Sequence, residues 1–317
     1  MSLYGFCKYL TLFTSKFYYH KIVVSGLEHV PLNKPVLLAL NHPNSFLDAV
    51  LVATYLNRPT HFLARGDVFK NKKAAFFLKA FHMLPVYRLS EGKENLHKNK
   101  ETFDSCQAIL EEKEVVLIFP EGLSENNWEL RDFKKGPGRI AMKAWKSDTP
   151  ANKLQILPIG LTYEHYQGGG KTILINIGEP ILESEITEKD SEAVFVKQFN
   201  QKIHEALHNL AFINKEMAEG TSMHWSFRAH LQQLVGKYKN APQIVKGLYE
   251  PGATQIVSNN NLIKQTLLFW PLYSFCNSLA KRMLKSGLFF DSVSFGLFIF
   301  LWPVYLVLVI TILINLI

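Results

Sequence analysis

Short apolar runs alternate with amphipathic segments along the first two thirds of the chain. Pro35–Leu40 (PVLLAL) and Val115–Phe119 (VVLIF) are continuously apolar, which predicts strands buried on both faces of a sheet. The segments between such runs repeat apolar residues at helical spacing, as in Leu96–Glu114. The same criteria predict further strands at Lys21–Ser25, His61–Ala64, Leu84–Arg88, Gln155–Thr162 and Lys171–Ile177, and further helices at Phe46–Leu56, Lys70–Phe81, Gly138–Lys146 and Phe195–Ile213. This alternation indicates an α/β domain over residues 21–215, with a mixed sheet flanked by helices.

The N-terminal segment, residues 1–20, has a different pattern. Its apolar side chains recur at spacings of three and four, which predicts an amphipathic helix, at Leu3, Phe6, Leu10, Phe13 and Phe17. Lysines interrupt the apolar stretch and no small-residue cleavage site follows, so the segment is not a cleavable signal. Such a helix suits two positions, flat on a bilayer surface or packed on the protein's own core.

The C-terminal region, residues 262–317, is the most apolar part of the chain. Ser292–Ile317 has 26 residues without a charge, with Trp302 and Pro303 near its middle. As a helix it would be roughly 39 Å long, more than the roughly 30 Å of a bilayer's hydrocarbon core. It therefore predicts a transmembrane segment, and a buried core helix is the alternative.

A second uncharged run, Thr266–Ala280, is short for a full span and suits an interfacial or re-entrant segment. The C-terminal region therefore crosses the membrane once or folds back as a hairpin. The basic segment Lys281–Lys285 is expected on the cytoplasmic side. The polar residues 216–261 are expected to form a partly helical connector.

Composition narrows the classes of protein. Hydrophobic residues make up 48% of 317 residues, which excludes intrinsic disorder. The net charge of +8 favours anionic partners, either lipid headgroups or nucleic acid. Nucleic acid is disfavoured, because the sequence has no zinc-finger spacing and no basic tract interleaved with aromatics. The three cysteines are far apart, which indicates free thiols in a reducing compartment rather than a metal site or a disulfide framework.

A histidine and a carboxylate follow the first continuously apolar strand, in the segment 41–48 (NHPNSFLD). A His–Asp pair can deprotonate a hydroxyl, because the imidazole takes the proton and the carboxylate fixes its tautomer. The sequence lacks a G-x-S-x-G serine motif, so the substrate's own hydroxyl would be the nucleophile. Alternatively, Ser45 and Asp48 form an S-x-x-D capping box, which would leave His42 unexplained.

Three unusual loops begin where predicted strands end, at residues 41–42, 65–66 and 120–122. Ligand sites of α/β sheets favour such an edge, although Pro120-Glu121-Gly122 also has the composition of an ordinary turn. Basic residues follow these loops, and arginine suits a phosphate ligand. Most charge runs are solvated faces. Arg88 is the stronger candidate because its predicted strand position restricts it.

Four segments in order carry a family resemblance: 41–48 (NHPNSFLD), 65–69 (RGDVF) with 84–88 (LPVYR), 119–122 (FPEG) and 157–161 (LPIGL). Together they resemble the glycerolipid acyltransferase family, of the 1-acylglycerol-3-phosphate acyltransferase (PlsC) type, over roughly residues 20–185. The resemblance implies an α/β domain on a membrane surface. It would transfer a fatty acyl group from coenzyme A or acyl carrier protein to a glycerolipid hydroxyl, with no metal and no cofactor beyond that thioester co-substrate.

The resemblance also implies roles for individual residues. His42 would be the general base and Asp48 its orienting partner. Arg88 would hold the acceptor's phosphate, and Pro158 and Gly160 would line the acyl region. The further substrate-binding residues implied are Arg65, Gly66, Phe69, Glu121 and Gly122.

Two departures from the family pattern are visible. The family has four residues between His and Asp, whereas five (PNSFL) intervene here. We expect Pro43-Asn44 to lengthen the loop before the helix, so that His42 and Asp48 still meet. The basic residue that usually follows the Glu-Gly turn is missing. Arg131 and Lys135 are the candidates to replace it, and the alternative is an acceptor without the usual phosphate.

The sequence thus predicts a membrane-bound O-acyltransferase with its active site facing the cytoplasm. Its partners would be the bilayer, an acyl thioester and a lysophospholipid, most simply 1-acylglycerol-3-phosphate, which would become phosphatidate. Glycerol-3-phosphate or a phosphate-free lysolipid is an alternative acceptor. Two alternatives differ in activity from an acyltransferase: a thioesterase and a catalytically inactive membrane-binding homologue.

Overall fold

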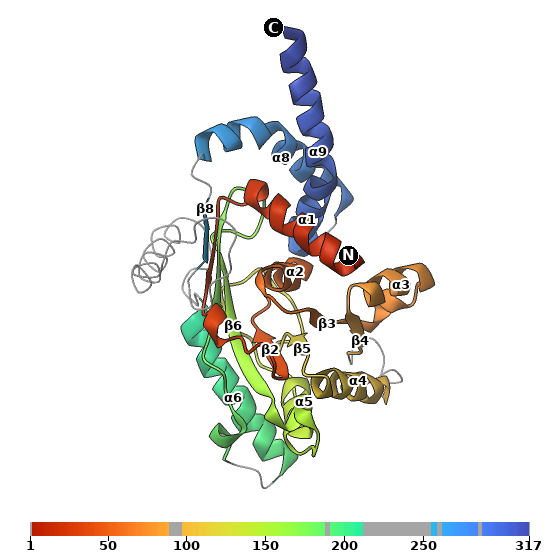
Figure 1. Ribbon diagram of the computed structural model, residues 1–317, viewed down its shortest axis with the longest axis vertical. Coiled ribbons are helices and arrows are strands. Elements are labelled where there is room, and N and C mark those ends of the chain that lie inside the picture. The colour runs from red at the N-terminus through yellow and green to blue at the C-terminus, as the bar shows by residue number, and fades with distance from the viewer. Residues whose placement is uncertain are drawn as a thin grey trace.

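The computed structural model describes residues 2–88, 97–187, 191–211, 255–258, 262–284 and 287–316. An eight-stranded sheet in the order β4-β3-β5-β2-β6-β7-β1-β8 runs through it (Figure 1). The strands are β1 (Lys21–Ser25), β2 (Val36–Leu40), β3 (Thr60–Arg65), β4 (Met83–Val86), β5 (Val115–Ile118), β6 (Gln155–Tyr163), β7 (Thr172–Ile177) and β8 (Gln255–Ser258). The pairs β6–β7 and β1–β8 are antiparallel and the other pairs are parallel, so the predicted mixed α/β sheet is confirmed.

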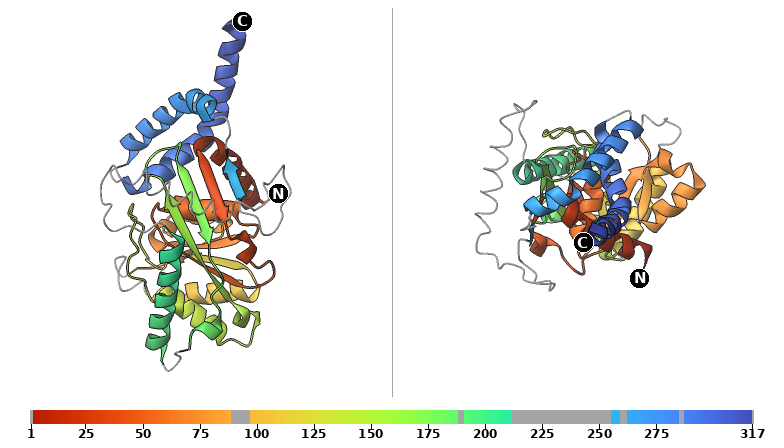
Figure 2. Two further views of the ribbon diagram at one scale, coloured as in Figure 1. Left: turned by 90° about the vertical axis from the view of Figure 1, so that its left-hand side faces the viewer. Right: turned by 90° about the horizontal axis from the view of Figure 1, so that it is seen from above.

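Helices cover both faces of this sheet (Figures 1 and 2). They are α1 (Leu3–Tyr18), α2 (Phe46–Tyr55), α3 (Lys72–Ala80), α4 (Asn99–Glu111), α5 (Gly136–Trp145), α6 (Glu192–Leu210), α8 (Leu262–Met283) and α9 (Phe290–Leu316). One buried cluster joins the sheet to α4, α5 and α6, and another joins it to α1, α2, α8 and α9. We call these the closed face and the open face of the sheet.

Strand β2 shows why its sequence has no alternation of apolar and polar residues. Val36, Leu38 and Leu40 point into the open-face cluster, while Leu37 and Ala39 point into the closed-face cluster. All five are fully buried. A central strand of this kind must be apolar on both faces, which is the pattern that predicted it.

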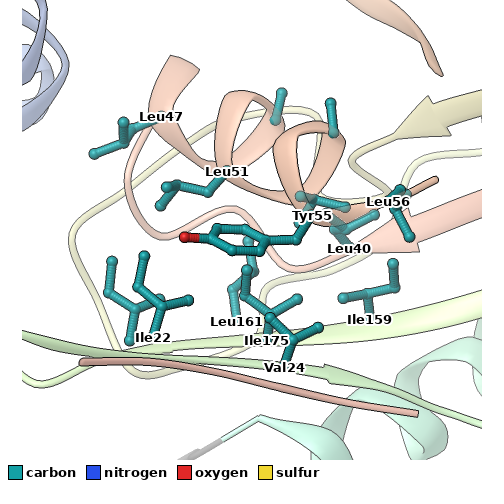
Figure 3. Packing of buried hydrophobic residues seen from close by; sticks show 14 of the residues in the cluster. Ile22, Val24, Leu40, Leu47, Leu51, Tyr55, Leu56, Ile159, Leu161 and Ile175 are labelled. Carbon is teal, nitrogen blue, oxygen red and sulfur yellow. The ribbon is translucent and has the colours of Figure 1, made fainter. Parts of the chain in front are cut away.

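Helix α2 packs directly on the open face of the sheet (Figure 3). Leu47, Leu51 and Tyr55 lie over side chains of β1, β2, β6 and β7 that include Ile22, Val24, Leu40, Ile159, Leu161 and Ile175. Because these contacts fix the helix, they also fix the loop between β2 and its first turn. That loop holds His42.

The N-terminal helix α1 packs on the protein's own core with one face. Thr11, Thr14, Ser15 and Tyr18 are buried, and the Ser15 and Tyr55 hydroxyls lie 2.9 Å apart. The opposite face exposes Leu3, Phe6, Tyr9 and Phe13. The packed position expected from the sequence is therefore observed, and the second face remains available for a bilayer surface.

Helix α9 runs without a break through Pro303, which lies near its middle. In the described part of the chain, one helix is long and apolar enough to cross a membrane, spanning residues 287–312, and it is largely unburied. Helix α8, which includes Pro271, packs against the inner part of α9 and lies across it, and the outer part of α9 extends beyond α8 (Figure 1).

Strand β8 was missed by the sequence analysis, which assigned residues 216–261 to a connector. Residues 255–258 pair antiparallel with β1 and close that edge of the sheet. The remaining residues of that predicted connector lie outside the described residues.

Candidate active site

Three strand ends meet at one edge of the sheet. β2, β3 and β5 are parallel neighbours, so the loops that follow them converge as predicted. The backbone N–H of His42, after β2, donates a hydrogen bond of 2.8 Å to Oε1 of Glu121, after β5. The first and third loops are therefore joined directly.

His42 and Asp48 form a hydrogen-bonded dyad. Nδ1–H of His42 donates to Oδ2 of Asp48 at 2.8 Å, across the five intervening residues. The imidazole stacks on the Phe119 ring at a centroid distance of 3.6 Å. Asp48 is completely buried, whereas His42 keeps part of its side chain accessible. This tautomer leaves Nε2 unprotonated and able to take a proton.

The longer spacing is accommodated as expected, by the loop before the helix. Asn44 N–H donates to the same Oδ2 of Asp48 at 2.8 Å. Ser45 adopts a positive φ of 57°, and its side chain makes no cap hydrogen bond to α2. The alternative capping box is therefore wrong, because Asp48 is engaged by the loop and by His42 instead.

Tyr163, at the end of β6, was not identified from the sequence. Its hydroxyl donates a hydrogen bond of 2.7 Å to Oδ1 of Asp48. Both carboxylate oxygens of Asp48 therefore accept hydrogen bonds. Burial, followed by the charge of Asp48, raises the pKa of Tyr163 well above its usual value. The phenol therefore stays protonated and remains a donor over the working pH range.

Glu121, which the family resemblance implied as an acceptor-binding residue, is buried and connects two loops. Its Oε2 accepts from Nε of Arg131 at 3.0 Å, while Oε1 accepts from His42. Arg131 also donates to Glu125 and to the Leu123 carbonyl. All three nitrogens of the guanidinium thus donate to protein groups.

A cavity of about 1970 Å³ opens in front of His42. Apolar side chains of α1, α2 and α9 form much of its wall. Basic side chains also line the cavity: Lys8, Arg65, Arg88, Lys100, Lys134, Lys135, Arg139 and Lys143. Arg65 pairs with Asp67 and Arg139 pairs with Glu192.

Not every expected substrate-binding residue reaches this cavity. His42, Arg65, Arg88, Gly122 and Lys135 do. Arg88 was predicted at the end of the strand Leu84–Arg88, but β4 ends at Val86, so Arg88 lies two residues past the strand.

Besides Glu121 and Arg131, four expected residues are not on its wall: Gly66, Phe69, Pro158 and Gly160. A Cβ on Gly66 would come within 2.3 Å of the Tyr87 ring, so glycine is needed there for packing. A Cβ on Gly160 would come within 2.4 Å of the backbone at Leu210, at the end of α6. Gly160 thus faces the end of α6, and Pro158, two residues earlier on the same strand, shares that face.

Comparison with known proteins finds an acyltransferase domain in this part of the chain. Residues 21–162 match the family model named Acyltransferase. A Bacillus subtilis 1-acyl-sn-glycerol-3-phosphate acyltransferase is 26% identical over 194 residues, which are 58% of this chain and 87% of that protein. A yeast glycerol-3-phosphate O-acyltransferase 2 is 35% identical over 112 residues, which are 34% of this chain and 15% of that protein. The crystal structure of PlsC from Thermotoga maritima superimposes with a TM-score of 0.46 at 17% identity, covering 69% of this chain and 82% of that one.

A mixed α/β sheet with a His–Asp dyad at its edge, together with the family match, defines an acyltransferase. The chain carries an acyltransferase domain at residues 21–162 and is similar to enzymes of the glycerolipid acyltransferase family. The resemblance stated from the four sequence segments is thereby confirmed.

Proposed function

We propose that this protein is a membrane-bound O-acyltransferase that acylates a lysophospholipid, with 1-acylglycerol-3-phosphate as the favoured acceptor. One observation carries the proposal. The His42–Asp48 dyad opens onto a large cavity that combines an apolar wall with basic side chains at its edge. A fatty acyl chain suits the apolar wall, and a phosphate suits the basic edge. The Bacillus relative's name supports the same acceptor.

His42 would act as general base. Nε2 takes the proton of the acceptor hydroxyl while its oxygen attacks the thioester carbonyl. The tetrahedral oxyanion then collapses, the C–S bond breaks, and the imidazolium returns the proton to the departing thiolate. Asp48 holds the tautomer and stabilises the imidazolium. The acyl group passes directly between the substrates, so the protein forms no acyl-enzyme.

Arg88 and Lys135 are the proposed phosphate ligands, since both line the cavity that His42 faces. Arginine offers a bidentate contact and lysine a point charge, which together suit a phosphomonoester. Arg131 is excluded from this role by its bonds to Glu121 and Glu125. If the acceptor carries no phosphate, Arg88→Ala should leave its turnover unchanged.

The membrane part of the proposal rests on the two ends of the chain. Helix α9 exposes apolar side chains along much of its length, including Phe300, Val304 and Val307. The apolar outer face of α1 could lie on the same bilayer. Lys281 and Arg282 end α8, which favours the cytoplasmic side for that turn and for the active site.

The test measures the free thiol that the detergent-solubilised protein releases from a long-chain acyl thioester, carried either by coenzyme A or by acyl carrier protein. Each reaction contains one acceptor: none, glycerol-3-phosphate, 1-acylglycerol-3-phosphate or a phosphate-free lysolipid. We expect release with 1-acylglycerol-3-phosphate, and His42→Ala should lower turnover at least about a hundredfold. Arg88→Ala should raise KM for phosphate-bearing acceptors alone.

Other outcomes identify the alternatives. Thiol release without any acceptor would indicate a thioesterase. Turnover with glycerol-3-phosphate in place of the lysolipid would move the assignment to the acceptor of the yeast relative. Near-full activity of His42→Ala would overturn the dyad mechanism, and no turnover with either donor would favour an inactive homologue.

A further inference from the structure

The base of the apolar helix α9 reaches into the loop that carries the dyad. Asp291, in the first turn of α9, is buried, and its Oδ2 accepts 2.8 Å from Nδ2 of Asn44. Its Oδ1 accepts 2.7 Å from the backbone N–H of Gly168. Lys171, also completely buried, donates to the same carboxylate. The hydrogen bond between Asn44 and Asp291 joins residues 247 positions apart in the chain.

We propose that Asn44 and Asp291 are positioning residues for the His42–Asp48 dyad, so that α9 holds the active site in its working geometry. The inference rests on the proposed function, because it concerns the same base. It assigns a task to a helix that lies outside the matched acyltransferase domain, which ends at residue 162.

The link from Asp291 to the dyad passes through one residue. Asn44 uses its side chain to reach Asp291 and its backbone N–H to reach Oδ2 of Asp48. That same Oδ2 accepts Nδ1–H of His42. A shift of the Asn44 backbone therefore changes the geometry of the His–Asp hydrogen bond directly.

The side-chain amide of Asn44 has one orientation that its surroundings accept. Both neighbours of Nδ2, the Asp291 carboxylate and the Tyr166 carbonyl, are acceptors. A flipped amide would place its oxygen against two other oxygens. The amide nitrogen of Asn44 must therefore point toward Asp291 as the hydrogen-bond donor. Lys171 compensates the negative charge of the Asp291 carboxylate.

The loop needs such an anchor because its conformation is unfavourable alone. Ser45 has a positive φ of 57°, which a residue with a side chain rarely adopts. Ser124 holds one side of the loop by accepting 2.6 Å from the Ser45 N–H. Asn44 and Asp291 hold the other side. Removing the second anchor should let the loop relax away from the geometry that the base requires.

The test compares Asn44→Ala with a control, Ser294→Ala, in the full-length protein. Asn44→Ala removes the link but leaves the Lys171–Asp291 ion pair intact. Ser294→Ala removes another buried contact of α9, the hydrogen bond from Tyr18, and does not touch the loop. We expect kcat to fall at least about tenfold in Asn44→Ala with KM for acyl-CoA within about twofold, because binding is preserved while the base is displaced. Ser294→Ala should keep the wild-type kcat.

A second variant covers the possibility that Asn44→Ala does not fold. Asp291→Asn with Lys171→Met removes both buried charges while keeping an oxygen that can accept from Asn44. It should retain kcat within about threefold, whereas Asp291→Ala with Lys171→Met, which lacks that acceptor, should lose about tenfold. Equal activity of the two double variants would overturn the proposal.

A spectroscopic measurement separates this proposal from the proposed function. With 15N-labelled histidine, the His42 Nδ1–H resonance is assigned by its loss in His42→Gln. We expect it to broaden or move upfield in Asn44→Ala and to stay in place in Ser294→Ala. An unchanged resonance in Asn44→Ala would overturn the positioning role. This readout holds even if the wild-type protein transfers no acyl group, which would contradict only the proposed function.

Discussion

The two faces of the sheet are built for different tasks. The closed face packs α4, α5 and α6 against the strands in one cluster of fully buried side chains. The open face packs α1, α2, α8 and α9 over another cluster, yet it leaves a cavity of about 1970 Å³ with His42 on its wall. Strand β2 contributes to both. The open face thus holds the dyad and the apolar wall of the cavity, whereas the closed face packs tightly and reaches the cavity only at its edge, through side chains of α4 and α5 such as Phe103 and Lys143.

The largest expected effect is on stability and concerns the closed face. Phe199 of α6 is 1% exposed and packs against Phe195 and Trp145. Phe199→Ala should cost about 3–5 kcal/mol, the usual range for a buried aromatic. Phe300→Ala, on the 76% exposed Phe300 of α9, should cost less than about 0.5 kcal/mol. Thermal unfolding in detergent measures the change in Tm of both variants. Equal decreases in Tm would contradict the expectation that the closed face contributes more to stability.

A smaller effect is expected on activity at the open face. Tyr163→Phe removes one of the hydrogen bonds to Asp48, worth about 0.5–1.5 kcal/mol, and should lower kcat about twofold to tenfold. Tyr55→Phe is the matched control, since its buried hydroxyl contacts Ser15 away from the dyad. Steady-state kinetics under saturating thioester decides the comparison. A loss of the same size in both variants would mean that the effect is general destabilisation.

The smallest effect concerns thiol reactivity. Burial raises the pKa of Cys106, on the closed face, to about 12, and burial also raises the pKa of Cys7, which lines the cavity. Because the thiolate reacts, alkylation of both should be slow near neutral pH and accelerate as pH rises, with Cys7 reacting well before Cys106. Peptide mass spectrometry after maleimide treatment measures the order. Faster labelling of Cys106 would show that the closed face opens more readily than the cavity.

Much of the fold and part of the site could be predicted because their signals are local. Continuously apolar runs predicted β2 and β5, and the short segment from His42 to Asp48 contained both members of the dyad. β8 escaped prediction because four residues in a polar stretch carry too little pattern. Pairing with β1 stabilises it instead.

The supports of the dyad could not be predicted for a related reason. Tyr163 lies 115 residues from Asp48, and Asp291 lies 247 residues from Asn44. Nothing in the residue types alone marks such partners. Arg131 is a further example, since its basic side chain suggested a phosphate ligand, whereas the fold pairs it with Glu121. The hydrogen-bond and ion-pair partners of such side chains depend on contacts that only the folded structure shows.

The ion pair between Lys171 and Asp291 sets an order of events during biosynthesis. The Lys171 ammonium is completely buried beside β7, and its carboxylate partner emerges from the ribosome 120 residues later. Until then the nascent sheet contains an uncompensated charge, which disfavours its final compact form. We therefore expect the sheet to reach its final packing only after α9 has been synthesised. The loop that holds His42 and Asn44 would take its final conformation at that same stage.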